Sequence, residues 1–201
     1  MTALPKLLDT SRRTAVSERE KRTYFEEVIL AYLRTEATYR DLYSNVWTWA
    51  EWAPANGLSA KDDGIDLVAQ AAGSGEIHAI QCKFYDANYK LRKEDIDSFF
   101  TASGRKPFAH RVIVSTTNHW SEHAENALVD QQPPVSKIDL HDLEASQIDW
   151  SCYQPKVAIQ ALKAKKSLRP HQETAVRAVV AGLQAADRGK LIMACGTGLS
   201  P

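Results

Sequence analysis

Lys61-Asp-Asp-Gly-Ile-Asp-Leu-Val-Ala-Gln70 is the stretch of this sequence that decides the fold, together with Ile77-His-Ala-Ile-Gln-Cys-Lys-Phe84. Each contains a short apolar run of the length typical of a strand. Gly73-Ser74-Gly75 lies between the two runs and supplies turn residues. The two stretches together predict a β-hairpin.

The alternation of side chains along a strand separates apolar from polar positions in this hairpin, because residues two apart share a face. The sets expected to be buried together are Ile65, Leu67 and Ala69 on the first strand and Ile80, Cys82 and Phe84 on the second. Asp66, Gln81 and Lys83 are then expected in one cleft. A carboxylate and an amide oxygen suit a hard cation such as Mg²⁺. A lysine beside them can orient a water molecule and stabilise negative charge on a phosphate.

A helix is predicted over residues 17–34, ahead of the hairpin. Ser17, followed three residues later by Glu20, fits a capping box. Apolar residues at helical spacing predict a buried stripe, made of Phe25, Val28, Ile29, Tyr32 and Leu33. Glu26 and Glu27 lie beside this stripe, and a one-residue error in the helix rotation would exchange them. Residues 1–16 are mixed in character and are expected to form a tail or short arm.

Three separated elements resemble the PD-(D/E)xK nuclease superfamily, and most closely its Mrr-like restriction branch. They are Phe25-Glu26 on the first helix, Gly64-Ile65-Asp66 on one strand and Gln81-Cys82-Lys83 on the next. Gln81 stands where the superfamily usually has an acid, which agrees with the Mrr-like pattern. The resemblance implies an α/β, restriction-endonuclease-like fold with a mixed central β-sheet flanked by helices.

The resemblance also implies hydrolysis of phosphodiester bonds in double-stranded DNA with Mg²⁺, for which Mn²⁺ can substitute. Asp66 and Gln81 would hold the metal together with a backbone carbonyl, that of Cys82. Glu26 would bind this ion or a second one through water. Lys83 would position the attacking water and stabilise the developing charge. The alternative is a module that keeps this fold and binds DNA or docks a neighbouring domain without cutting.

Aromatic and basic residues near the hairpin allow two interpretations each. The three tryptophans in residues 42–53 could stack on DNA bases, but packing in the core is favoured because tryptophan is usually well buried. Lys90, Arg92 and Lys93 follow the hairpin and could contact DNA phosphates. They could equally form the solvated start of a helix.

His119-Trp-Ser-Glu122-His123 matches the H-x-x-E-H pattern of inverted zinc peptidases. That chemistry requires both histidines on one helix face with the glutamate as base. His119 falls at the end of a predicted strand, and no obvious third ligand follows. A surface helix with two ordinary histidines is therefore the favoured interpretation.

The C-terminal part resembles the opening of a superfamily 2 helicase motor, which has a RecA-like fold. The residues in nucleotide-binding positions are Arg169 and Gln172 on the adenine side, and Gly196, Thr197 and Gly198 in a phosphate-binding loop. Leu199 and Ser200 stand where that loop needs lysine and threonine. We therefore expect a truncated, inactive ATPase segment, with ATP a cofactor only of the full-length protein.

The expected order of parts is an arm (1–16), a nuclease domain (17–150), a linker (151–167) and the truncated start of a helicase domain (168–201). A nuclease followed by a motor resembles type ISP or type I-like restriction-modification enzymes, which translocate on DNA. That resemblance implies methyltransferase and target-recognition domains in the same polypeptide. It also implies a second nuclease copy for double-strand breaks.

Composition narrows the class of protein. The chain has 201 residues, 44% hydrophobic and 25% charged, which suits one globular domain with an appendage. Its formal net charge is zero, so any DNA-binding surface must be local. The three cysteines are far apart in sequence, which argues against a disulfide framework or structural zinc. With no apolar run of about 18 residues and no signal-peptide core, a cytoplasmic protein without membrane contact is expected.

Overall fold

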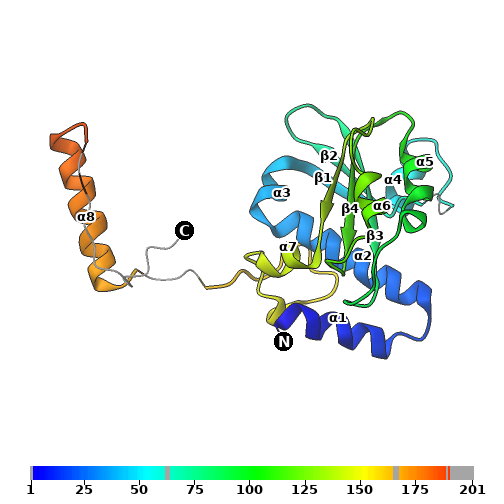
Figure 1. The fold of residues 1–201 in the computed structure, drawn as a ribbon, viewed down its shortest axis with the longest axis horizontal. Coiled ribbons are helices and arrows are strands. Elements are labelled where there is room, and N and C mark those ends of the chain that lie inside the picture. The colour runs from blue at the N-terminus through cyan, green and yellow to red at the C-terminus, as the bar shows by residue number, and fades with distance from the viewer. Residues whose placement is uncertain (1, 62–63, 165–167, 189, 191–201) are drawn as a thin grey trace. The chain divides into compact units, whose positions relative to one another are not determined.

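The computed structural model describes residues 2–61, 64–164, 168–188 and 190. It divides the chain into two compact units, Met1–Lys163 and Ala164–Pro201. The first unit contains a five-stranded sheet with helices on both faces, as Figure 1 shows. The second contains helix α8 (Pro170–Ala185).

The predicted hairpin lies at the centre of the sheet. Its strands are β2 (Leu67–Ala71) and β3 (Ile77–Lys83), which pair antiparallel. β1 (Tyr43–Thr48) pairs antiparallel with β2, whereas β4 (Phe108–Ser115) and β5 (Val135–Ile138) continue the sheet in parallel beyond β3. The order β1-β2-β3-β4-β5 therefore confirms the α/β architecture with a mixed central sheet.

One face of the sheet is covered by three helices, α1 (Ala3–Thr14), α2 (Glu18–Thr35) and α7 (Leu140–Ala145) (Figure 1). Leu67, Ile80 and Val112 of the strands share a buried cluster with these helices. Phe25 and Ile29 of α2 are fully buried in this cluster, as their helical spacing predicts. The short α3 (Ala37–Leu42) links α2 to β1.

The opposite face carries α4 (Trp49–Ala55), the 3₁₀ turn η1 (Lys93–Asp95), α5 (Asp97–Ser103) and α6 (Glu122–Asn126). α5 connects β3 to β4 and α6 connects β4 to β5, so both parallel crossovers lie on this face. Trp49 and Trp52 are buried here, and the Trp52 ring lies 5.7 Å from that of Phe108. Core packing is therefore the right interpretation for these two tryptophans, and Trp47 is partly buried beside them.

The N-terminal segment differs from the expected tail or arm, because residues 3–14 form helix α1. Leu4 and Leu8 lie one helical turn apart, and each is 1% exposed within the same cluster as α2. Burying a leucine stabilises a fold by about 1.5–3 kcal/mol, so these two side chains anchor the helix. Two apolar positions among many polar ones were too sparse a signal to predict it.

The start of β2 differs from the alternation expected for the hairpin. Ile65 packs in the cluster of α4 and α5, whereas Leu67 and Ala69 pack in the cluster of α1 and α2. The strand begins at Leu67, and Gly64 before it has a φ of 84°. A glycine adopts this left-handed conformation without strain, so the chain turns here and residue 65 leaves the strand's alternation.

The end of the first unit lies beyond residue 150. Ile148 and Leu162 form a β-bridge, and Gln160 is 4% exposed with its backbone N–H donating to Thr35 Oγ1 at 3.0 Å. Residues 151–163, expected to be linker, therefore belong to the first unit instead. Trp150 begins the 3₁₀ turn η2 (Trp150–Cys152) and is buried in the core.

Two further sequence expectations concern helices. His119 precedes α6, whose N-cap is Ser121, so His119 and His123 do not share a helix face and the zinc-peptidase geometry is not formed. None of the helices in the described residues is long and apolar enough to cross a membrane.

Candidate active site

Asp66 is fixed against β3 by hydrogen bonds of its backbone and its carboxylate. Its N–H donates to Ile80 O at 3.0 Å, and its carbonyl accepts from Trp49 N at 2.8 Å. Oδ2 accepts from the backbone N–H of Cys82 at 2.6 Å. Because the N–H and C=O of one strand residue point to the same neighbouring strand, the carbonyl of Cys82 also points towards Asp66.

The thiol of Cys82 takes no part in this site. Its side chain is 7% exposed and belongs to the cluster of α1 and α2 on the other face of the sheet. Burial raises the pKa of the thiol well above its usual value, and the charges of Asp66 and Glu26 raise it further. The thiol therefore stays protonated, and the backbone carbonyl is the metal-binding group that this residue can offer.

Gln81 carries a buried side-chain oxygen that has no hydrogen-bond partner among the described residues. Its side chain is 4% exposed, and Nε2 donates to Gly64 O at 3.0 Å. This bond orients the amide, so that Oε1 is a buried acceptor that receives no hydrogen bond. An unsatisfied buried acceptor costs about 1–3 kcal/mol, which makes this oxygen a ready ligand for a cation.

Lys83 ends β3 on the same face as Gln81 and is partly buried. Burial lowers the pKa of its ammonium, while the carboxylates of Asp66 and Asp95 act in the opposite direction. Within the described residues, Nζ makes neither an ion pair nor a hydrogen bond. The simple interpretation of Asp66 and Lys83 as a structural ion pair is therefore not what the geometry shows.

Glu26, rather than Glu27, faces the hairpin. Glu26 and Asp66 line one cavity, which we call the α2 cavity and which is also bounded by Thr48 and Trp49. The ring of Phe25 stacks on that of Phe84 at 5.3 Å, and this contact sets the rotation of α2. Glu27 lies instead beside Tyr24 and Tyr153, where its charge adds to the effect of burial in raising the pKa of both phenols.

A second cavity, the hairpin cavity, lies against the end of β3. Its lining residues include Gly64, Asp66, Gln81, Cys82, Lys83, Tyr85 and Ser98. Asp66 lines both cavities, so the carboxylate, the amide and the lysine that the sequence singled out do come together.

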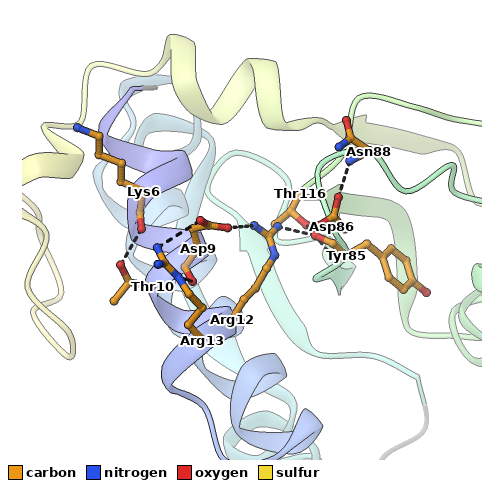
Figure 2. A network of polar contacts seen from close by, with 9 residues as sticks. All are labelled: Lys6, Asp9, Thr10, Arg12, Arg13, Tyr85, Asp86, Asn88 and Thr116. Atoms are coloured by element: carbon orange, nitrogen blue, oxygen red, sulfur yellow. Dashed lines mark hydrogen bonds and ion pairs between the residues drawn. The ribbon is translucent and has the colours of Figure 1, made fainter.

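The loop after Lys83 is held by helix α1, as Figure 2 shows. Arg12 Nη2 donates to Tyr85 O at 2.5 Å, and its guanidinium lies 4.8 Å from the centre of the Phe84 ring. Thr116 Oγ1 donates to the same Tyr85 carbonyl at 2.6 Å and accepts from Tyr85 N at 2.8 Å. A helix that the sequence did not predict therefore helps to position the end of the strand that carries Lys83.

The basic residues predicted to contact DNA lie outside both cavities. Lys90, Arg92 and Lys93 are exposed, and Lys93 Nζ forms an ion pair with Asp97 at 2.7 Å. Their role in DNA binding stays a prediction. Sequence reasoning missed Arg19 and Arg22, which line the α2 cavity from the same helix as Glu26. Arg19 and Arg22 stand seven and four residues before Glu26, a spacing that places all three on one helix face. This spacing was the sequence signal that could have identified them.

The donor set fits a divalent cation of the oxygen-preferring kind. Asp66 supplies a carboxylate, Gln81 an unpartnered amide oxygen and Cys82 a carbonyl directed to the same place. Among the described residues, no group of three or more His, Cys, Asp or Glu side chains could hold a metal ion. A carboxylate together with amide and carbonyl oxygens is a set that suits Mg²⁺ better than Zn²⁺.

The predicted nucleotide-binding residues are only partly visible. Arg169 is the N-cap of α8, and its backbone N–H donates to Gln172 Oε1 at 2.9 Å. Both residues therefore form a capping arrangement at the start of a helix. Gly196, Thr197 and Gly198 lie outside the described residues.

Comparisons with known proteins point to one class of enzyme. The Mrr_cat_2 family model, described as a restriction endonuclease, matches residues 34–160. A solved structure, "ATP-dependent Type ISP restriction-modification enzyme LlaBIII bound to DNA", is 35% identical with a TM-score of 0.76. The match covers 98% of this chain but 12% of that one, so the present sequence spans about an eighth of its relative. No curated protein matches. The site geometry and the family match agree, and the chain belongs to the restriction endonuclease family.

Proposed function

We propose that the unit Met1–Lys163 is a Mg²⁺-dependent endodeoxyribonuclease domain of an ATP-dependent restriction-modification enzyme. The observation that carries the proposal is the buried, unpartnered Oε1 of Gln81, which lines one cavity with Asp66 and Lys83. Two oxygen donors beside a lysine that forms no ion pair with a carboxylate of the described residues support a site for a cation and a phosphate over a structural ion pair.

Each group has a separate task in the proposed reaction. Asp66, Gln81 Oε1 and the Cys82 carbonyl would hold Mg²⁺, which when bound supplies a Lewis acid for the phosphate oxygens. Glu26 would orient water at the α2 cavity. Lys83 holds its proton on Nζ and stabilises the negative charge that develops on the phosphate.

The wider enzyme remains part of the proposal. The DNA-bound relative is a type ISP restriction-modification enzyme, which supports double-stranded DNA as the substrate. We expect motor, methyltransferase and target-recognition domains in the same polypeptide, with ATP bound by the motor. One such site cuts one strand, so a second copy of the domain is expected at double-strand breaks.

Cleavage of supercoiled plasmid tests this proposal. Wild-type protein should nick the plasmid in the presence of Mg²⁺ or Mn²⁺, and nicking should stop when EDTA removes the metal ion. Lys83→Ala should lose nicking by a factor of about 10² or more, the usual size of one charge-stabilising group, with a melting temperature no lower than that of the wild type. Lys6→Ala removes an exposed lysine from α1 and serves as the matched control. Metal-independent nicking, or nicking by Lys83→Ala at the wild-type rate, would disprove the assignment.

A further inference from the structure

The N-terminal half of α2 presents a polar row to the α2 cavity. Arg19, Arg22, Thr23 and Glu26 line it, and their spacing of three, four and seven residues places them on one helix face. Arg22 also lines the hairpin cavity, together with Gln81 and Lys83. This arginine therefore lies where the two cavities meet, next to the groups assigned to catalysis.

The charge of Arg22 is not used within the described part of the fold. Its side chain is exposed and makes no ion pair or hydrogen bond with a described residue, although Glu18 and Glu26 are close in sequence on the same helix. Lys21, its neighbour on α2, is by contrast paired with Glu18 at 2.6 Å. The Arg22 guanidinium still acts on the site, because it adds to the effect of burial in lowering the pKa of Lys83.

We propose that Arg22 binds a backbone phosphate of the DNA strand being cut, beside the bond that Asp66, Gln81 and Lys83 act on. This inference rests on the proposed nuclease function and names the part of the site that holds the substrate. A guanidinium matches the oxygens of a phosphate with two parallel hydrogen bonds, so it fixes orientation as well as charge.

Arg19 extends the same contact along the strand. It lies one helical turn before Arg22, in the same cavity, and it too has no polar partner among the described residues. Two arginines in a row along one helix face can follow the phosphates of one strand. Contacts to phosphates fix the register of the protein on DNA and carry no sequence preference, so specificity is expected from elsewhere in the enzyme.

The salt dependence of DNA binding tests the inference without needing cleavage. Binding of a short labelled duplex is measured by fluorescence anisotropy in EDTA, over a series of salt concentrations. Each phosphate contact contributes about 0.9 to the slope of log K against log salt. Arg22→Ala should therefore reduce the slope by about 0.9 and weaken binding about tenfold at low salt, as expected for one hydrogen-bonded charge. Arg22→Lys should keep the slope, because it keeps the charge.

Lys21→Ala is the matched control, since it removes one positive charge from the adjacent position of α2 outside both cavities. It should leave the slope unchanged. Equal slopes for Arg22→Ala and Lys21→Ala would overturn the inference, as would a wild-type protein that does not bind the duplex.

Nicking by the same variants separates the two proposals. If wild-type protein nicks DNA in a Lys83-dependent way but Arg22→Ala binds normally, the phosphate contact is wrong and the nuclease assignment survives. If Arg22→Ala lowers the slope but no variant nicks, the contact is real and the catalytic assignment fails.

Discussion

Replacing Gln81 by glutamate tests the proposed metal site without an activity assay. The amide donates from Nε2 to Gly64 O at 3.0 Å, and an ionised glutamate cannot. Removing a donor from a buried acceptor costs about 1–3 kcal/mol. The new carboxylate is also buried near Asp66, and both effects raise its pKa. Each unit of this rise adds about 1.4 kcal/mol to the loss in free energy of unfolding.

We therefore expect Gln81→Glu to lose about 2–4 kcal/mol of stability without metal. For a unit of this size that corresponds to a fall in melting temperature of about 5–15 °C. The loss should be smaller at pH 5 than at pH 8, because a protonated glutamate regains a donor for Gly64 O. Mg²⁺ at about 100 times its Kd should restore roughly 2.7 kcal/mol, and the gain should exceed that of the wild-type amide.

Thermal melting with and without Mg²⁺ measures these changes. Gln70→Glu is the control, because Gln70 Nε2 also donates to a glycine carbonyl, Gly75 O at 3.4 Å, at the turn end of the same hairpin. That variant should melt near the wild-type temperature and respond to Mg²⁺ as the wild type does. The reasoning is refuted if Gln81→Glu is as stable as wild type without metal, or if Mg²⁺ stabilises both variants equally.

Burial of Lys83 at the site and of Leu8 in α1 leads to three further predictions. The pKa of Lys83 lies below its usual 10.5, so nicking should fall as the pH rises through that lowered pKa, and Lys83→Arg should move the fall to higher pH. In stability, charging Lys83 destabilises the fold at neutral pH, and the penalty should disappear as the pH approaches 10.5. Leu8→Ala should lower the free energy of unfolding, measured in urea, by about 2–5 kcal/mol, because Leu8 is buried. The same substitution in an N-terminal arm outside the core would leave this free energy almost unchanged.

The sequence by itself determined the elements whose signals are local. The apolar runs around Asp66 and Lys83, with turn residues between them, predict the hairpin that the structure contains. The helical spacing of the apolar residues predicts α2, and Ser17 accepts a hydrogen bond from Glu20 N at 3.1 Å, as its capping position requires. The resemblance carried by these three elements, which occur in the order of the Mrr-like family, predicted the restriction endonuclease family that the family match shows.

How those elements meet depends on contacts between residues far apart in the sequence. The choice between Glu26 and Glu27 depends on the rotation of α2, which is set by the contact of Phe25 with Phe84, a residue far away in sequence. The turn at Gly64 moved Ile65 to the other face of the sheet, which no alternation rule could reveal. The unpartnered Oε1 of Gln81 likewise exists only because Gly64 O takes the amide hydrogen.

The same distinction explains α1 and the end of the nuclease unit. Leu4 and Leu8 carry a weak helical signal, and their burial depends on the surface that α2 and the sheet provide. Residues 151–163 pack because Leu162 reaches Ile148 and Gln160 reaches Thr35. Local patterns predict which face of a segment can be buried, whereas long-range packing determines what that face packs against. The residue types of the candidate site could therefore be predicted from the sequence, and their geometry depends on the fold.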